Sequence, residues 1–234
     1  MAAPRDEQER LITLAEKAAV ELEGAQPRQV LQWAKDEFGD NLCMTSSMAD
    51  AVLSTLAGEV IPGIDVIFLD TGYHFAETVG TRDAVSATVP VNVLSVRPSQ
   101  TVAEQDETYG PKLYERNPDL CCHLRKVRPL QASLSSYWAW MSGIRRDETP
   151  DRADMPIVSW DPKREMVKIN PLACWTQDDV DAYVAEKGVL INPLMYDGFA
   201  SIGCAPCTRR VAPGEDPRAG RWAGMNKTEC GLHT

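Results

Sequence analysis

The sequence predicts an α/β fold in which a parallel twisted sheet is flanked by helices. Three short apolar runs, at residues 41–45, 64–70 and 91–96, have the length and composition of buried strands. Segments with helical spacing of apolar residues separate these runs, so the order is strand, helix, strand, helix, strand. Parallel strands need such crossovers, because the chain has to return to the end of the sheet at which it started.

The helices of the first half are indicated by apolar spacing and by proline. Residues 6–23 carry apolar side chains at three- and four-residue intervals, which is typical of an amphipathic helix. Pro27 suits the first turn of a second helix, which we expect to continue to about residue 38. Two more helices are expected between the strands, over residues 51–59 and up to about residue 87.

The middle of the chain predicts helices and then more strands. Residues 98–130 are helical in pattern but are interrupted by three prolines. Residues 137–142 predict a fourth strand that leads into a Gly-Ile-Arg-Arg segment. Residues 157–160 and 166–169 are short apolar runs that can pair as a hairpin.

The last third of the chain predicts one further helix and then turns. Thr176 and Asp179 have the spacing of a capping box, so a helix is expected to begin there and to end near residue 187. We find no internal repeat and no linker that divides the chain. The prediction is therefore one domain over residues 1–234, with a nucleotide-binding core over about 30–200 and a C-terminal segment over about 201–234.

Composition and charge limit the classes of function. No apolar stretch approaches the roughly 20 residues of a membrane span, and the charged N-terminus has no signal-peptide core. We therefore expect a cytoplasmic protein with reduced thiols and no membrane partner. The net charge of −10 argues against a nucleic-acid partner. Residues 1–110 hold 7 Lys and Arg against 18 Asp and Glu, whereas 111–234 hold 17 against 16, so the second half suits a small anionic ligand.

Four of the seven cysteines form two pairs that predict a metal centre. Cys121 and Cys122 are adjacent, and Cys204 and Cys207 form a Cys-x-x-Cys motif. Neighbouring residues on a helix point about 100° apart, so an adjacent pair converges poorly on one zinc ion but can reach two corners of an iron–sulfur cluster. The cluster is favoured, and zinc or unrelated core cysteines remain alternatives.

The other cysteines differ from these pairs. Cys43 lies in a predicted strand and Cys174 precedes a tryptophan, so both are expected to be small buried apolar groups. Cys230 lies four residues before the end of the chain, on a short polar tail. A thiol at a chain terminus can reach into a cleft formed elsewhere, because termini are the least constrained part of a domain. We interpret Cys230 as the thiol that does chemistry beside the metal centre.

A nucleotide site is predicted where the first two strands end. In parallel sheets, ligands bind beyond the carboxyl ends of the strands, near helix N-termini. Ser46, Ser47 and Asp50 follow the first strand, and Leu69 ends the second. Serine is also an ordinary helix cap, which remains an alternative for this loop. His74 is equally compatible with a cap and with a ligand contact.

Five separated motifs, in the same order along the chain, closely resemble the assimilatory adenylyl-sulfate reductases of the PAPS/APS reductase family. The resemblance covers about residue 30 to the end of the chain. It is carried by Ser46-Ser47-x-x-Asp50, by Leu69-Asp70-Thr71-Gly72, by Cys121-Cys122 with residues 125–130, by Gly143-Ile144-Arg145-Arg146, and by residues 227–233 around Cys230.

The resemblance implies a fold and a reaction. The family fold is of the adenine-nucleotide α-hydrolase type, whose ATP-cleaving relatives have an SGGxDS loop; both glycines are absent from SSMAD here. The family reduces adenosine 5′-phosphosulfate to sulfite and AMP with electrons from thioredoxin, in sulfate assimilation. The branch with all four paired cysteines binds a 4Fe-4S cluster and mostly uses this substrate. Use of 3′-phosphoadenosine 5′-phosphosulfate, as well or instead, is the alternative.

The resemblance also implies roles for individual residues. Cys230 is the nucleophile, and Cys121, Cys122, Cys204 and Cys207 are the cluster ligands. The positions that match the family's substrate-binding residues are Ser46, Ser47, Asp50, Leu69, Lys126, Arg218, Arg221 and His233, together with one or both of Arg145 and Arg146.

Two rival classes of function are less compatible with the sequence. Cluster-bearing enzymes of the same fold that transfer sulfur to tRNA need an intact SGGxDS loop and usually have a basic RNA-binding face, and this chain has neither. A non-enzymatic zinc-binding module does not explain a long α/β core with a thiol on its tail.

Overall fold

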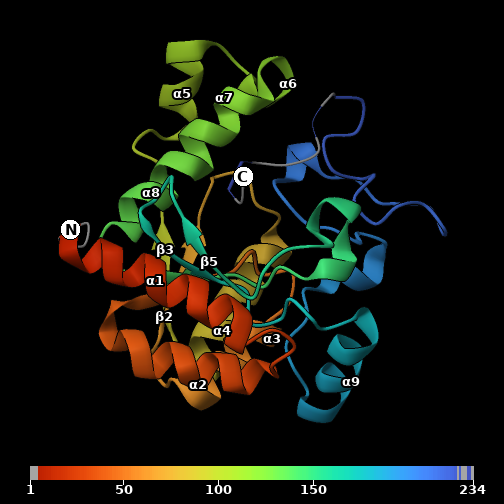
Figure 1. Ribbon diagram of the computed structural model, residues 1–234. Helices are drawn as coiled ribbons and strands as arrows, with labels where there is room; N and C mark the ends of the chain where they lie inside the picture. The colour runs from red at the N-terminus through yellow and green to blue at the C-terminus, as the bar shows by residue number, and fades with distance from the viewer. Residues whose placement is uncertain (1–4, 226, 228–230, 233–234) are drawn as a thin grey trace.

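The computed structural model describes residues 5–225, 227 and 231–232 (Figure 1). Its described part contains a six-stranded sheet with the order β3-β2-β1-β4-β6-β5. All neighbouring strands are parallel except β5 and β6, which form an antiparallel hairpin. The strands are β1 (Leu42–Thr45), β2 (Asp65–Leu69), β3 (Asn92–Val96), β4 (Ala139–Met141), β5 (Val158–Asp161) and β6 (Met166–Ile169). The predicted mostly parallel α/β sheet is therefore confirmed.

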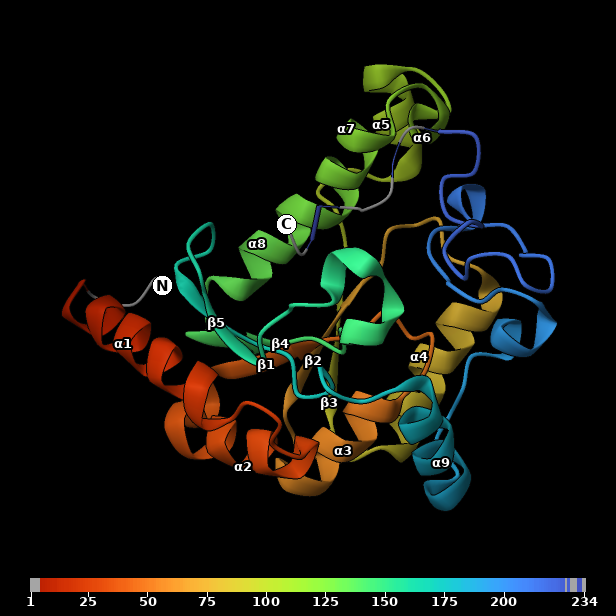
Figure 2. The same ribbon diagram turned by 45° about the vertical axis from the view of Figure 1, so that its right-hand side comes forward.

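Each face of the sheet is buried by a different set of helices, because side chains alternate along a strand. Met44, Val66 and Met141 point to one face, where the main core packs against α1, α2, α3, α4 and α9. Cys43 and Trp140 point to the other face, where a smaller core packs against α8. Figure 2 shows α5, α6, α7 and α8 on one side of the sheet and α1, α2, α3, α4 and α9 on the opposite side.

The helices follow the predicted pattern in the first half of the chain. They are α1 (Arg5–Glu21), α2 (Pro27–Phe38), α3 (Val52–Val60) and α4 (Ala76–Thr88). Pro27 occupies the first turn of α2 as predicted, where its missing N–H has no helical partner to lose. The predicted helix near residue 176 is α9 (Gln177–Lys187), and its Thr176–Asp179 capping box is present. No helix among the described residues is long and apolar enough to cross a membrane.

The proline-interrupted region forms a chain of short helices. These are α5 (Val102–Tyr109), α6 (Leu113–Arg116), α7 (Pro118–Cys122) and α8 (Arg128–Leu134). Between α7 and α8, residues His123–Val127 form one turn of π-helix, which the sequence pattern did not predict. Such turns are rare and frequently lie at functional sites.

Cys43 and Cys174, which belong to neither cysteine pair, have different environments. Cys43 is completely buried in the smaller core, as predicted. Cys174 is exposed, so its prediction as a buried apolar group is wrong. It lies in the turn before α9, where the preceding Ala173 fills the core position, and its Sγ is 3.5 Å from Arg146 Nη1.

The turns of the last third hold the loop after β1 in place. Beyond α9 the described regular structure consists of the short 3₁₀ turns Pro193–Asp197 and Ala205–Cys207, as the turn-rich sequence predicted. The fully buried Asn192 donates its amide to the carbonyl oxygen of Met48 at 3.0 Å and to Thr78 Oγ1 at 3.1 Å. This amide therefore connects the loop after β1 to α4. The boundary near residue 200 between core and C-terminal segment remains a prediction.

Replacing Asn192 should destabilise the protein measurably. Asn192→Ala removes both bonds and leaves the Met48 carbonyl buried without a partner, so we expect a loss of about 2 to 4 kcal/mol in the free energy of unfolding. Chemical denaturation measures this loss. Asn92→Ala is the control, because its amide bonds to Asp65 in an exposed position. Equal stability of the two variants would contradict this account.

Candidate functional site

A cavity of about 450 Å³ lies at the carboxyl ends of β1, β2 and β4. The chain leaves β1 toward β2 and enters the other half of the sheet at β4, so the cavity lies at the switch in strand order. Ligands of open α/β sheets bind at such a point, because the loops on its two sides diverge. The volume suits a nucleotide-sized ligand. The cavity is therefore the candidate binding site.

The loop after β1 forms one wall of the cavity. Ser46, Ser47 and Asp50 all line it. Met48 has a φ of 59°, a left-handed conformation that is uncommon outside glycine, and its side chain is fully buried. The loop is fixed internally, since Ser46 Oγ accepts the Met48 N–H at 3.2 Å and Asp50 Oδ1 accepts the Val52 N–H at 2.9 Å. Burial raises the pKa of the Asp50 carboxyl, and the Val52 N–H and Arg145 oppose this effect.

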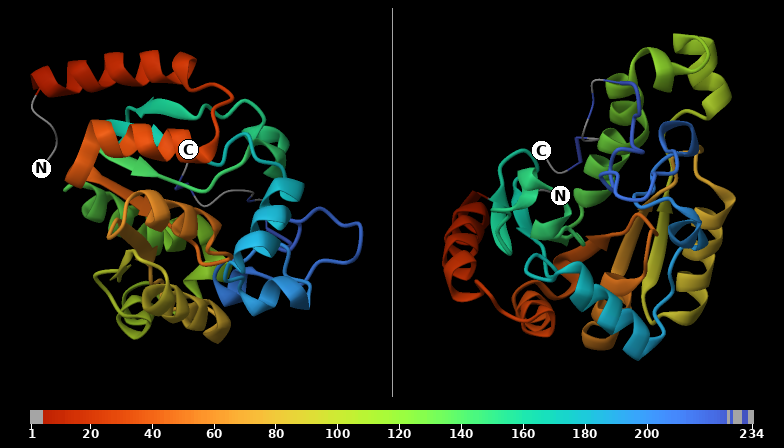
Figure 3. Two further views of the ribbon diagram at one scale, coloured as in Figure 1. Left: turned by 90° about the horizontal axis from the view of Figure 1, so that it is seen from below. Right: turned by 90° about the vertical axis from the view of Figure 1, so that its right-hand side faces the viewer.

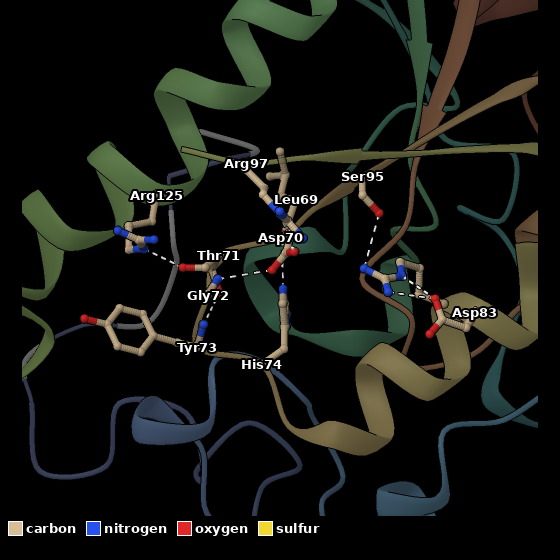
Figure 4. A network of polar contacts seen from close by, with 11 residues as sticks. Leu69, Asp70, Thr71, Gly72, Tyr73, His74, Asp83, Ser95, Arg97 and Arg125 are labelled. Carbon is tan, nitrogen blue, oxygen red and sulfur yellow. Dashed lines mark hydrogen bonds and ion pairs between the residues drawn. The ribbon is translucent and has the colours of Figure 1, made fainter. Parts of the chain in front are cut away.

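The loop after β2 is cross-linked by its own polar groups (Figure 4). Asp70 accepts the Gly72 N–H at 3.2 Å, and the His74 ring bonds to the Leu69 carbonyl oxygen at 2.8 Å. Burial lowers the pKa of His74, which favours the neutral ring. Its second nitrogen, Nδ1, is buried without a partner among the described residues, and both His74 and Leu69 line the cavity. His74 can therefore offer Nδ1 to a ligand.

Cations from three parts of the chain line the cavity. Lys126 comes from the π-turn, Arg145 follows β4, and Arg218 and Arg221 come from the C-terminal turns. Arg152 lines it too and is buried to 9% exposure. A concave site lined by these charges favours an anionic ligand, because field lines are concentrated where water is excluded. The geometry thus suits a phosphate or sulfate group.

The structure distinguishes Arg145 from Arg146. Arg145 lines the cavity, where its Nη2 donates to Gln177 at 2.7 Å. Arg146 points away and forms a two-bond ion pair with Glu23, at 2.6 and 2.9 Å. Arg146 is not among the residues that line the cavity, and its role in substrate binding stays a prediction. Its guanidinium is held by the connection between α1 and α2, outside the cavity lining.

Arg221 is packed tightly against the backbone of the C-terminal turns. Its guanidinium lies over the Trp222 ring, 4.6 Å from the centroid, and Nη1 donates to the Ile202 carbonyl oxygen at 3.2 Å. A Cβ at Gly203 would lie only 2.4 Å from Arg221 Nη2. Gly203 therefore provides the space in which the guanidinium lies.

The two cysteine pairs lie together, as predicted. Cys121, Cys122, Cys204 and Cys207 line one small cavity with Tyr73 and Tyr114. Figure 3 shows the C-terminal turns, in blue, beside the green helices that carry the first pair. Thr71 Oγ1 is 3.3 Å from Cys204 Sγ. Burial, together with the other thiols of the group, raises the pKa of Cys121 to about 12 and that of Cys207 to about 11.

The predicted metal centre is not shown by the structure. In the described part of the chain, no group of three or more Cys, His, Asp or Glu side chains is arranged to hold a metal ion. Four cysteine thiols around one buried cavity are nevertheless the donor set of an iron–sulfur cluster, in which each thiolate reaches a different iron. Lys126 and Trp222 line both this cavity and the larger one, so the two sites are neighbours.

The predicted site and the observed site differ in two ways. Cys230 and His233, the predicted nucleophile and a predicted substrate contact, lie outside the described residues. Arg152, Trp140 and Trp222 line the larger cavity and were not predicted. Arg152 belongs to no recognisable motif; its one signal is that it follows the Gly-Ile-Arg-Arg segment closely in a polar stretch.

Comparison with known proteins identifies related chains. The model of the phosphoadenosine phosphosulfate reductase domain matches residues 41–210. The adenosine 5′-phosphosulfate reductase of Streptomyces coelicolor is 62% identical, over 96% of this chain and 95% of that protein. The protein of the same name from Mycolicibacterium smegmatis is 56% identical, over 94% and 93%.

Solved structures extend the comparison to the fold. The phosphoadenylyl-sulfate reductase of Candida auris, in a phosphate complex, has a TM-score of 0.70 and 26% identity, over 90% of this chain and 99% of that one. The FMN adenylyltransferase of Candida glabrata in complex with ATP has a TM-score of 0.54 at 14% identity, over 87% and 65%. The second similarity shows a shared fold alone.

Filling the space beside Arg221 should weaken anion binding. Gly203→Ala displaces the guanidinium, because the new methyl group would overlap it. We expect the affinity for AMP, measured by calorimetry, to fall about tenfold, the effect of losing one charge-assisted contact. Gly80→Ala is the matched control, since a Cβ there meets nothing within 4 Å. Unchanged affinity in Gly203→Ala would show that Arg221 does not hold the anion.

Proposed function

Since the chain belongs to the phosphoadenosine phosphosulfate reductase family, we propose that it is the assimilatory reductase that converts adenosine 5′-phosphosulfate to sulfite and AMP. The observation that carries this proposal is the cation-lined cavity at the carboxyl ends of β1, β2 and β4, next to the four-thiol cavity. Relatives named for this activity share 52–62% of their residues with the chain over nearly its whole length.

The substrate is adenosine 5′-phosphosulfate rather than its 3′-phosphorylated form. The support is the set of four paired cysteines, which in this family accompanies the substrate without the 3′-phosphate. The names of the relatives support the same choice. Reduction of the 3′-phosphorylated nucleotide, as well or instead, is the alternative, and a competition between the two nucleotides distinguishes them.

In the first step, the thiolate of Cys230 attacks the sulfur atom of the sulfate group. A bond forms between the two sulfur atoms, the bond from the sulfate sulfur to the phosphate oxygen breaks, and AMP leaves with the electron pair. Cations lower the pKa of a nearby thiol and stabilise the leaving phosphate. Lys126, Arg218 and Arg221 line the cavity where both effects are needed, and His233 is the fourth residue proposed for this role.

In the second step, thioredoxin releases the product. One of its thiolates attacks the sulfur of Cys230, and sulfite leaves with the electron pair of the sulfur–sulfur bond. The second thiol of thioredoxin then resolves the mixed disulfide, so Cys230 returns as a thiol and thioredoxin becomes oxidised. This exchange needs reduced thioredoxin, which supports a cytoplasmic location.

The four paired cysteines would hold a 4Fe-4S cluster. Thioredoxin supplies both electrons, so a bound cluster would supply local charge, and its ligands would connect α7 to the C-terminal turns. Lys126 follows Cys122 by about one helical turn and lines both cavities. Its ammonium group is thus suited to connect the charge of the cluster with that of the substrate.

A covalent adduct on Cys230 tests the proposed reaction. Incubation with sulfur-labelled adenosine 5′-phosphosulfate, without thioredoxin, should place one label on the peptide that contains Cys230, as measured by mass spectrometry. Cys230→Ser should form no adduct and lose turnover. The control, Cys174→Ser, changes an exposed thiol outside the cavity and should keep both. Turnover at the parent's rate in Cys230→Ser would exclude the mechanism.

The link through Lys126 is tested on the cluster itself. Lys126→Ala should keep the iron content of the parent and lose the change in cluster absorption that nucleotide binding produces, because the charge between the two cavities is removed. Cys122→Ser should lose iron, which is measured by metal analysis. An iron-free parent with full activity would contradict the cluster, and an unchanged spectral response in Lys126→Ala would contradict the link.

A further inference from the structure

The last described residues of the chain are bound by a side chain that lies outside the nucleotide cavity. Arg164, in the turn between β5 and β6, donates from Nη2 to the carbonyl oxygen of Leu232 at 2.9 Å. The two residues are 68 positions apart in the sequence. Figure 2 shows this end of the chain beside α8.

Arg164 is held in position by contacts that do not involve the C-terminal segment. Its Nη1 forms an ion pair with Asp161 Oδ2 at 2.7 Å, and both side chains are only 9% exposed. Its guanidinium lies over the Trp140 ring, 5.3 Å from the centroid. Asp161 Oδ1 also accepts the backbone N–H groups of Lys163 and Arg164, which fixes the turn. Nη2 is therefore preorganised to meet the Leu232 carbonyl.

The side chain of Leu232 makes a second contact of the same segment. It packs against the smaller core, which contains Ile67, Leu130 and Trp140. Leu232 also lines the nucleotide cavity, together with Trp140 and Lys126. The segment thus forms part of the cavity wall on the side of α8.

Arg164 itself does not line the nucleotide cavity. It lines instead an open hollow on the other side of the segment, with Lys163, Lys227 and Gly231. On the far side of this hollow, Lys227 forms an ion pair with Asp119 of α7. Arg164 therefore contacts the segment from outside the lining of the nucleotide cavity.

We infer that Arg164 is a positioning residue, which anchors Leu232 in the wall of the nucleotide cavity and thereby favours the attack by Cys230. The inference rests on the proposed function, in which Cys230 is the nucleophile. Cys230 precedes Leu232 by two residues in the sequence, so an anchor at Leu232 restricts the nucleophile directly. Arg164 should contribute to formation of the adduct and not to nucleotide affinity or to the thioredoxin step.

The test measures adduct formation in a single turnover, in the holoenzyme. Arg164→Ala removes the donor, and Arg164→Lys keeps the charge but loses the planar guanidinium, whose two nitrogens bond separately to Asp161 and Leu232. Lys163→Ala is the matched control, since it removes a neighbouring charge of the same turn whose side chain is exposed and makes no contact with Leu232.

We expect the rate of adduct formation on Cys230 to fall about 10- to 100-fold in Arg164→Ala, the range of one charge-assisted hydrogen bond. Arg164→Lys should lie between this variant and the parent, and Lys163→Ala should equal the parent. The affinity for AMP, the iron content and sulfite release from a preformed adduct should stay at the parent's values in all three. Equal adduct rates in Arg164→Ala and Lys163→Ala would overturn the inference.

Hydrogen exchange of the C-terminal peptide gives a readout that does not depend on catalysis. It should be faster in Arg164→Ala than in Lys163→Ala, and equal exchange would overturn the docking. Leu232→Ala keeps the buried ion pair and the carbonyl oxygen to which Arg164 donates, and it removes the apolar contact of the segment with the smaller core. It should slow adduct formation, and a parent-like rate would contradict a role of this apolar contact in the docking. A parent that forms no adduct would refute the proposed function, whereas the exchange comparison would still decide the docking.

Discussion

The buried guanidinium of Arg125 determines how the two cavities lie relative to each other. It is 4% exposed, donates through Nε to the Thr71 carbonyl oxygen, and bonds through Nη1 to Gln105 at 3.1 Å. It thereby joins the loop after β2 to the π-turn that carries Lys126 (Figure 4). The same Thr71 contacts Cys204 through its hydroxyl group. One charged side chain thus connects the sheet, the thiols and the wall of the nucleotide cavity.

Several cationic side chains around the nucleotide cavity are stabilised by hydrogen bonds, ion pairs or ring contacts within the protein. Arg145 is bonded to Asp147 and Gln177, and Arg221 lies on Trp222. These contacts fix the guanidinium groups before a ligand arrives, so less side-chain entropy is lost on binding. The arrangement also explains how a chain with a net charge of −10 can bind an anion, since the local field and not the total charge acts on it.

Periodicity predicted the sheet well because alternation and helical spacing are local properties of the chain. The properties that were missed depend on partners far away in the sequence. Arg145 and Arg146 are adjacent and chemically identical, but Arg146 is held outside the cavity lining by Glu23, 123 positions away, and by the Met155 carbonyl oxygen. Cys174 was predicted as buried because free cysteines commonly are. It is exposed because it lies in the turn before α9, and this turn has no periodic pattern that would predict its exposure. Arg164 belongs to no motif, and its partner Leu232 lies in the last turn of the chain.

The left-handed Met48 has a consequence for how the nucleotide site comes into being. A glycine there would let the backbone adopt either sign of φ at little energetic cost. Met48 has a positive φ, and its side chain is enclosed by the main core. The ordering of the loop is therefore coupled to that of the core. An arriving nucleotide then meets a loop that is already ordered, so little further entropy is lost there on binding.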